Sequence, residues 1–354
     1  MRLHPAVQIA LLPLSWIYGA VVVARAWLYR RGILKQKRLN GVVISVGNLT
    51  VGGAGKTPMV FTLAQRLLDR GKKVGILSRG YRGRTRTDEH LPALDSAEND
   101  SVPLVLSDET WMMERHFGGK VHLGVGADRY AHGQALQQKG IDWFLLDDGF
   151  QHLQLARDVD IVLVDATDPF GDGHLLPTGR LREPKSALKR ADMLVITRAE
   201  HAPAVESVLR RHTRAPIFYA RPDLKEVCPG ENSRVQAVPN GWLGRKMFAF
   251  CAIGNSRSFF EDVRQWGMEI VGQRAFPDHY RYTAADAADI EGLATAAGAE
   301  ALLCTDKDTY NLKGVWFQKL PLYTCRINMK VFDPGNFWPT LYEIIKRKRA
   351  GAAP

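Results

Sequence analysis

A glycine-rich stretch that begins at Gly47 contains the residue types needed to hold a phosphate chain. It reads GNLTVGGAGKTP, and Gly55, Lys56 and Thr57 match the end of the pattern G-x-x-x-x-G-K-[ST]. In such loops backbone N–H groups surround the phosphates, the lysine reaches the β- and γ-oxygens, and the hydroxyl ligates Mg²⁺. The first glycine of the pattern is replaced here. The stretch predicts that ATP and Mg²⁺ are cofactors and that the nucleotide is bound by Thr50, Gly52, Gly53, Ala54, Gly55, Lys56 and Thr57.

Two adjacent carboxylates follow an apolar run further along the chain, in the stretch WFLLDDGFQH. In a parallel sheet, ligands bind at the carboxyl ends of the strands. We therefore predict that Asp147 holds Mg²⁺ beside Thr57, with Asp148 as a second candidate. An aspartate after a strand is more often a turn residue, but the phosphate-binding loop upstream favours a metal ligand.

The segments around these residues alternate between strand-like and helix-like patterns. A β-branched run precedes the loop at 41–46, and a segment with apolar residues at helical spacing follows it at 58–68. Further strands are predicted at 73–77, 102–106, 121–125, 143–146, 160–164 and 193–197. This alternation predicts an α/β fold of the P-loop NTPase type, with a mostly parallel sheet covered by helices on both faces.

The composition changes along the chain in a way that indicates more than one domain. The sequence has 354 residues, of which 45% are hydrophobic, and prolines and glycines gather between 214 and 241. We predict a membrane-associated helix with its basic flank, a P-loop core domain, an inter-domain connection, and a smaller C-terminal α/β domain that completes the active site. Their predicted ranges are 1–38, 39–215, 216–241 and 242–354. Four scattered cysteines without a C-x-x-C pair are interpreted as reduced packing residues: Cys228, Cys251, Cys304 and Cys325.

The N-terminal segment is apolar and is followed by basic residues. Residues 3–24 contain no Lys, Arg, Asp or Glu, and the first acidic residue of this chain of net charge +11 is Asp69. The segment is long enough to span a membrane, whereas Pro13 and Ser15 weaken that interpretation. We favour a helix that enters one leaflet or lies in the interface, next to anionic lipid. A full span and a soluble core helix remain the alternatives.

Eight short motifs, in a fixed order, carry a resemblance to a known family. They are GNLTVGGAGKTP, SRGY, SDE, DDGFQH, LLPTGRLREP, AIGN, FPDHY and TDKD. Together they resemble the tetraacyldisaccharide 4′-kinases of lipid A biosynthesis over nearly the whole chain. The resemblance implies transfer of the γ-phosphate of ATP to the 4′-hydroxyl of a tetraacylated glucosamine disaccharide 1-phosphate, which gives lipid IVA. It also implies a location at the cytoplasmic face of the bacterial inner membrane.

Some positions fit the family and others depart from it. The family's loop has the form GN-x-x-x-GG-x-GKT, which accounts for Thr50. Ser256 stands where the family usually has proline, Asp306 stands where it has glutamate, and Ser107 replaces the glycine of GDE. None of these departures removes a group that the chemistry needs, but they leave the shapes of the turns near Asn255 and Ser107 open.

The same resemblance implies a base for the acceptor hydroxyl, formed by Asp108 of SDE and His279 of FPDHY. A carboxylate bonded to one imidazole nitrogen sets the tautomer and supports the charge that develops as the other nitrogen takes the proton. Taken alone, His279 would more often be structural. Arg129 in GADRY and Arg182 in GRLREP are candidates for phosphate or transition-state contacts, with a surface ion-pair role as the alternative.

Two other classes of function are weighed against the kinase. A membrane-associated P-loop ATPase that acts as a switch would hydrolyse ATP without an acceptor and would not need His279. A nucleic-acid binder is suggested by the basic balance and by the arginines at 79–86. We do not expect nucleic acid as a partner, because the sequence has no zinc pattern, helix-turn-helix signal or basic strand interleaved with aromatic residues.

Overall fold

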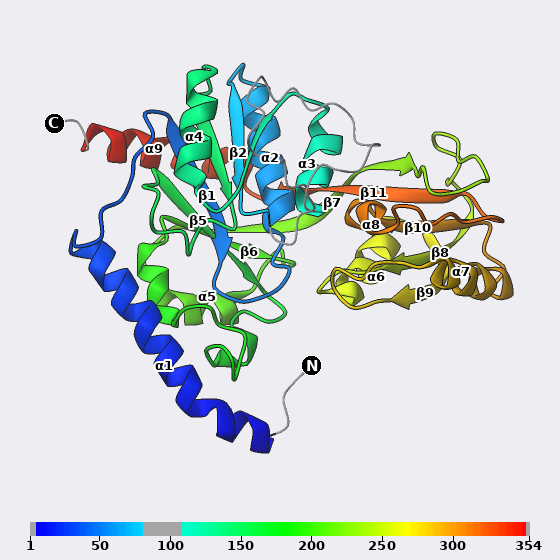
Figure 1. The fold of residues 1–354 in the computed structure, drawn as a ribbon, viewed down its shortest axis with the longest axis horizontal. Coiled ribbons are helices and arrows are strands. Elements are labelled where there is room, and N and C mark those ends of the chain that lie inside the picture. The colour runs from blue at the N-terminus through cyan, green and yellow to red at the C-terminus, as the bar shows by residue number, and fades with distance from the viewer. Residues whose placement is uncertain (1–4, 81–107, 352–354) are drawn as a thin grey trace. The chain divides into compact units, whose positions relative to one another are not determined.

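The computed structural model describes residues 5–80 and 108–351 of the chain (Figure 1). The chain forms two compact units. The first contains residues 1–80, 119–221 and 329–354, and the second contains residues 81–118 and 222–328. The strand predicted at 102–106 and the arginines at 82, 84 and 86 lie outside the described residues.

The first unit is built around a parallel sheet. Its strand order is β3-β2-β4-β1-β5-β6-β7, and each neighbouring pair is parallel. The strands are β1 (Val42–Asn48), β2 (Val74–Ser78), β3 (His122–Val125), β4 (Trp143–Asp147), β5 (Val159–Asp165), β6 (Met193–Thr197) and β7 (Ile217–Pro229). The helices are α1 (Pro5–Arg30), α2 (Lys56–Leu68), α4 (Arg129–Gln138), α5 (Pro203–Arg210) and α9 (Pro334–Ala350).

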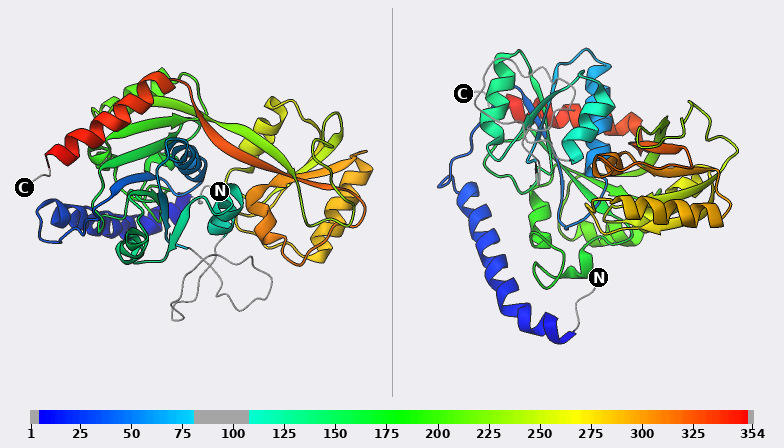
Figure 2. Two further views of the ribbon diagram at one scale, coloured as in Figure 1. Left: turned by 90° about the horizontal axis from the view of Figure 1, so that it is seen from above. Right: turned by 45° about the vertical axis from the view of Figure 1, so that its right-hand side comes forward.

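Helices cover both faces of this sheet (Figure 2). On one face Val43 of β1 packs with Leu136 of α4, and Val162 of β5 packs with Leu209 of α5. On the other face α2 and α9 lie together. The guanidinium carbon of Arg66 in α2 is 5.5 Å from the ring centroid of Trp338 in α9. Burial on both faces explains why β1 and β4 read as continuous apolar runs and not as alternating ones.

The second unit contains the strands β11-β10-β8-β9, which continue the strand order of the same 11-stranded sheet. Alternate strand residues form two cores, one against α7 with Cys304 and one against α6 with Cys251 and Cys325. All four cysteines are free and buried, which confirms their predicted role in packing. The elements are α3 (Asp108–Phe117), β8 (Lys246–Cys251), α6 (Ser256–Gln265), β9 (Glu269–Ala275), α7 (Ala284–Ala296), β10 (Ala301–Thr305), α8 (Asp306–Asn311) and β11 (Leu322–Val331).

The predicted α/β fold is confirmed, including the strands at 73–77, 121–125, 143–146, 160–164 and 193–197 within a residue or two. The compact units divide the chain differently from the predicted domains. Residues 216–241 contain the long strand β7, and β7 and β11 both include residues of the two units. Residues 329–354 belong to the first unit. The division into functional domains stays a prediction.

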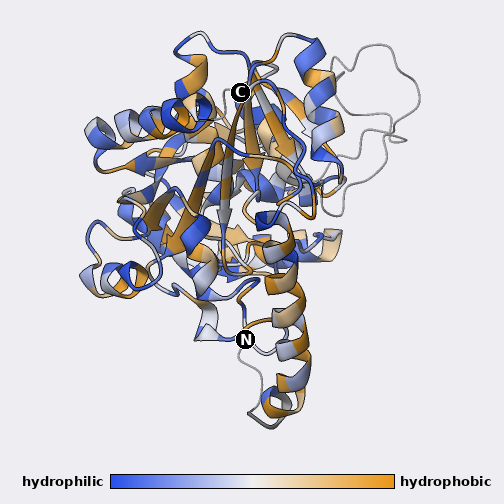
Figure 3. Cartoon of the chain, turned by 90° about the vertical axis from the view of Figure 1, so that its left-hand side faces the viewer, coloured by the Kyte–Doolittle hydropathy of each residue, from blue (hydrophilic) through white to orange (hydrophobic). Residues whose placement is uncertain are grey.

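Helix α1 is mostly apolar (Figure 3). By length and composition Gln8–Arg30 is sufficient to cross a membrane, a test that a signal sequence or a core helix also passes. A core helix is mostly buried, whereas 11% of this apolar segment is buried. Large apolar side chains such as Ile9, Trp16 and Ile17 are 68%, 72% and 62% exposed. The helix therefore presents an apolar face that the described part of the chain does not cover.

Candidate nucleotide site

The glycine-rich loop connects β1 to α2 at the carboxyl edge of the sheet. Gly55 caps α2 with a left-handed φ of 85°, and no side chain caps the first turn. The left-handed φ favours glycine at this position, and a Cβ there would also press on the flexible end of the Met329 side chain. The uncapped N–H groups and the helix dipole favour an anion at this end of α2. The strand–loop–helix context predicted for the phosphate loop is therefore present.

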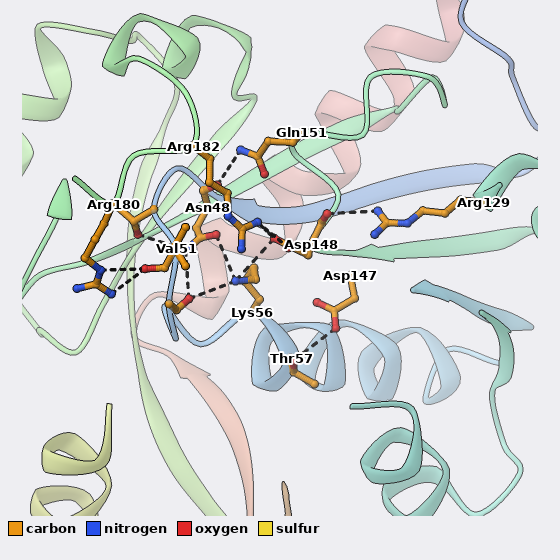
Figure 4. Close-up of polar contacts among 12 residues, drawn as sticks. Asn48, Val51, Lys56, Thr57, Arg129, Asp147, Asp148, Gln151, Arg180 and Arg182 are labelled. Carbon is orange, nitrogen blue, oxygen red and sulfur yellow. Dashed lines mark hydrogen bonds and ion pairs between the residues drawn. The ribbon is translucent and has the colours of Figure 1, made fainter. Parts of the chain in front are cut away.

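Lys56, the first residue of α2, is held over the loop by three oxygen atoms (Figure 4). Its Nζ donates to Oδ1 of Asn48 at 3.2 Å and to the main-chain oxygen of Gly52 at 3.4 Å. It also lies 3.7 Å from Oδ1 of Asp148. The side chain of Lys56 is 13% exposed. The ammonium group of Lys56 therefore provides a positive charge at a fixed position beside the loop.

Asp147 ends β4 next to the loop, because Val46 of β1 pairs with Asp147 in the parallel register. The hydroxyl of Thr57 donates to Oδ2 of Asp147 at 3.4 Å. The structure thus brings together the hydroxyl and one of the two carboxylates that the sequence predicts for Mg²⁺. Hydroxyl and carboxylate oxygens are the hard ligands that Mg²⁺ prefers, usually with water and phosphate oxygens completing the shell. The donor set at Thr57 and Asp147 fits this ion.

Asp148 follows in a strained backbone conformation, with a φ of 51°. Its carboxylate faces cations and not the Thr57 hydroxyl: Nη1 of Arg182 donates to both carboxylate oxygens, at 2.8 and 2.6 Å. Burial acts to raise the pKa of Asp148, but the charges of Lys56 and Arg182 outweigh it and hold that pKa below its usual value. Asp148 therefore organises positive charge at the loop.

The two arginines singled out from the sequence lie on opposite sides of Asp148. Arg182 meets its carboxylate, whereas Nη1 of Arg129 donates to its main-chain oxygen at 3.2 Å. Arg129 is buried at the start of α4. The structure thus places Arg129 against the backbone that carries the two aspartates. Whether either arginine contacts phosphate stays a prediction.

Three further residues shape the loop and were not assigned from the sequence, although their letters occur in the quoted motifs. Asn48 holds Lys56, and Nε2 of Gln151 donates to the main-chain oxygen of Asn48 at 3.0 Å. Arg180 donates through Nη2 to the main-chain oxygen of Val51 at 2.7 Å. The signal for all three was present in GN, DDGFQH and LLPTGRLREP, where polar residues stand beside the ones that carry the chemistry.

The remaining loop residues are positioned by neighbouring segments. Thr50 accepts from Nδ2 of Asn48 at 3.4 Å and forms an isolated antiparallel bridge with Leu181. Ala54 is buried, and its main-chain oxygen accepts from the Thr197 hydroxyl at 3.1 Å. A Cβ at Gly53 would meet no heavy atom within 4 Å in the described part of the chain beyond its immediate neighbours. Open space at Gly53 beside anchored neighbours suits a loop that wraps a ligand.

The predicted base residues both belong to the second unit. Asp108 begins α3, and its side chain lies outside what the structure describes. His279 has a left-handed φ of 60° and a side chain 30% exposed. Its Nε2 lies 3.7 Å from Oδ2 of Asp278 and 3.5 Å from Nζ of Lys307. The pairing of Asp108 with His279 stays a prediction.

Comparison with known proteins gives consistent findings. The family model described as tetraacyldisaccharide-1-P 4′-kinase matches residues 7–346. The chain is 38% identical to the tetraacyldisaccharide 4′-kinase of Koribacter versatilis, over 95% of this chain and 99% of that one. It is 38% identical to the enzyme of the same name from Geobacter sulfurreducens, over 93% and 91% of the two chains. The crystal structure of LpxK from Aquifex aeolicus in complex with ATP is similar with a TM-score of 0.71 and 31% identity, covering 96% of this chain and 99% of that one.

Proposed function

Because the chain belongs to the tetraacyldisaccharide-1-phosphate 4′-kinase family, we propose that its described residues serve the reaction of that family. The chain is an ATP-dependent kinase of lipid A biosynthesis. The acceptor is the 4′-hydroxyl of a tetraacylated disaccharide 1-phosphate, and the product is lipid IVA. The observation that carries the proposal is the convergence of Lys56, Thr57, Asp147 and Asp148 at the uncapped start of α2.

In this proposal the loop binds the phosphates of ATP, and Lys56 contacts the oxygens on which charge develops. Phosphoryl transfer asks a protein mainly for positioning and for neutralisation of that charge. Arg182 contributes a second positive charge close to Lys56, since both side chains approach the same carboxylate, that of Asp148. The residues of the loop keep the γ-phosphoryl group in one place, and the cations stabilise its transfer.

Mg²⁺ would be held by Thr57 and Asp147. When bound, the ion would neutralise charge on the phosphate oxygens. Asp148 is less suited to direct ligation, because both of its carboxylate oxygens already accept from Arg182. The role proposed for Asp148 is to orient Arg182 and Lys56, and its contacts with Arg182 favour Asp147 as the ligand of Mg²⁺.

We propose the pair of Asp108 and His279 as the base that takes the proton of the acceptor hydroxyl. The test is kcat for lipid phosphorylation in Asp108→Ala, His279→Ala and the double variant, together with ATP affinity. Each single change is expected to lower kcat by about 10²–10⁴-fold, the usual range for general base catalysis. The double variant should be little slower than either single one, because residues that act as a unit are not additive. Multiplicative losses would show two independent residues, and loss of ATP affinity would reassign Asp108 to the metal site.

We also propose that the exposed face of α1 lies in the cytoplasmic leaflet of the bacterial inner membrane, where the acylated substrate resides. A buried apolar face and adjacent basic residues both add membrane affinity. Trp16→Asp changes a side chain that is 72% exposed, so it should weaken flotation with vesicles that contain anionic lipid while leaving the fold intact. Equal flotation of the variant and the wild type would contradict this orientation of α1.

The function itself is tested with purified full-length protein, labelled ATP and Mg²⁺, with and without the disaccharide lipid. We expect label to appear in the lipid, and ATP turnover to depend on it. ATP turnover that is unaffected by lipid, with no labelled lipid, would overturn the kinase function and would favour the switch ATPase.

A further inference from the structure

Helix α1 and the nucleotide site share a connecting segment, residues 175–182. The hydroxyl of Ser15 donates to the main-chain oxygen of Leu175 at 2.9 Å. The hydroxyl of Tyr18 donates to the main-chain oxygen of Arg182, also at 2.9 Å. Ser15 and Tyr18 lie on one face of the helix, since residues three apart are neighbours on its surface. The apolar helix is therefore joined through that face to the residue that binds Asp148.

This contact is close, and it is buried at Ser15. Ser15 is 4% exposed although its neighbour Trp16 is 72% exposed, and the hydroxyl of Thr178, itself 4% exposed, donates to Oγ of Ser15 at 3.0 Å. One turn along, a Cβ at Gly19 would lie 2.6 Å from Cδ1 of Leu175. Glycine at this position lets the helix approach the segment. A helix that presented apolar surface to lipid alone would need neither the buried hydroxyls nor the glycine.

The far side of the same segment supports the phosphate loop. The N–H of Arg182 donates to the main-chain oxygen of Leu49 at 2.8 Å, and the N–H of Val51 donates to the main-chain oxygen of Arg180 at 2.8 Å. The guanidinium of Arg182 binds Asp148. Arg182 is thus held at three places: by the loop through its N–H, by Tyr18 through its carbonyl, and by Asp148 through its side chain.

We propose that Tyr18 is a positioning residue for Arg182 and that it couples the seating of α1 to the charged groups at the nucleotide site. Tyr18 sets the main chain of Arg182, and the main chain sets where the guanidinium meets Asp148. When the helix is displaced from the segment, the carbonyl of Arg182 loses its donor and the arginine is held at two places only. The inference rests on the proposed function, because it concerns the rate of the same reaction.

The state of the Tyr18 hydroxyl suits this role. Burial and the neighbouring carboxylate of Glu183 raise the pKa of Tyr18, against a smaller opposite influence of Arg182. The phenol therefore keeps its proton and remains a donor throughout the neutral and mildly alkaline range. The activity lost on removing the hydroxyl should accordingly be the same at pH 7 and pH 9.

The main test compares Tyr18→Phe, Arg182→Ala and the double variant in the full-length protein, with Tyr29→Phe as the matched control. Tyr29 lies on the same helix, with the guanidinium carbon of Arg25 5.8 Å from its ring centroid, and in the described part of the chain its hydroxyl has no hydrogen bond to residues 175–182. We measure kcat, KM for ATP, and flotation with phosphatidylglycerol-containing vesicles. Thermal unfolding checks that each variant is folded.

We expect Tyr18→Phe to lower kcat by about two- to tenfold, the range of one neutral hydrogen bond, with KM for ATP and flotation within about twofold of the wild type. Tyr29→Phe should leave all three unchanged. In the Arg182→Ala background Tyr18→Phe should have no further effect, because residues that act through one another are not additive. A Tyr18→Phe variant as active as Tyr29→Phe, or one whose loss multiplies with that of Arg182→Ala, overturns the proposal.

A second measurement does not depend on lipid kinase activity, so it separates this inference from the proposed function. Backbone amides of residues 175–182 should exchange hydrogen faster in Tyr18→Phe than in Tyr29→Phe, because the segment has lost an anchor. Equal exchange in the two variants overturns the positioning role. If the wild type phosphorylates no lipid but the two variants differ in exchange as expected, the proposed function is overturned and the positioning role is kept.

Discussion

Two regions of the molecule place aspartates directly after a buried parallel strand, and they use them differently. In the first unit β4 leads into Asp147 and Asp148, which face a hydroxyl and two cations. In the second unit β10 leads into α8, where Asp308 is fully buried and accepts from the N–H and hydroxyl of Thr305. Its other oxygen accepts from the N–H of Ala252 at 2.7 Å and from the hydroxyl of Tyr282 at 2.9 Å.

The difference lies in the partners and not in the position on the sheet. Neutral donors surround Asp308, and burial raises its pKa. Two cations approach Asp148, and they lower its pKa in spite of burial. An aspartate whose oxygens accept from neutral donors stabilises the fold, whereas one that faces cations holds those cations in place beside the loop. The predictions below test this contrast.

The largest effect is expected from the cation at the first region. Lys56→Ala should lower turnover about a thousandfold, since an interaction that strengthens in the transition state and contributes about 4 kcal/mol corresponds to that factor. The measurement is kcat for lipid phosphorylation at saturating ATP. Activity close to that of the wild type would show that the loop is not the phosphate site.

Removing a charge at the second region should act on stability. Asp308→Asn places an amide N–H₂ among groups that are themselves donors, and the cost of buried donors without acceptors is about 2–4 kcal/mol in the free energy of unfolding. Thermal unfolding should show a lower Tm, while the activity of the folded fraction is retained. A variant of normal Tm that is inactive would give Asp308 a direct role and would remove the contrast.

The two aspartates of the first region should separate in their dependence on Mg²⁺. Asp147→Asn should lower kcat about a hundredfold at ordinary Mg²⁺ and raise the Mg²⁺ concentration needed for half-maximal rate. Asp148→Asn should lower kcat without that shift, because its carboxylate is expected to hold Arg182 and Lys56. If Asp148→Asn is the variant that needs more Mg²⁺, the assignments of the two residues are exchanged.

The smallest effect is expected on the pH dependence of stability, from one histidine in each unit. Burial and nearby arginines lower the pKa of His152 to about 4, and burial and Lys225 lower the pKa of His116 to about 3. Both are neutral in the fold but take a proton more readily when unfolded, so their contribution to stability is complete above pH 6.5 and is lost as pH falls toward 4. From pH 7 to pH 5 we expect a loss of about 1–2 kcal/mol for each.

Variants of these histidines test whether stability falls, as predicted, when the pH is lowered. His152→Gln and His116→Gln should each make Tm less dependent on pH between 7 and 5. Each kcal/mol of free energy of unfolding that no longer varies with pH corresponds to about 2–4 °C in Tm. A steeper slope in either variant would mean that the buried histidine is charged in the fold.

Much of this protein follows from local sequence patterns. The spacing of Gly55, Lys56 and Thr57, the β-branched run before them and the apolar helix after them specify a phosphate loop, because each is a property of neighbouring residues. The alternation of strands and helices specifies the parallel sheet, and the order of motifs specifies the family. Asp147 and Asp148 are adjacent in sequence, so their presence at the carboxyl edge follows from the strand that precedes them.

The tertiary structure decided which partners these residues meet. Adjacent aspartates leave a strand in different directions, and the left-handed φ of Asp148 turns its carboxylate to Arg182 while Asp147 meets Thr57. The bond from Tyr18 to Arg182 joins residues far apart in the chain, and no periodicity predicts it. Sequence patterns report neighbours along the chain, whereas the charge and the donors around a side chain are set by whichever segments the fold packs against it.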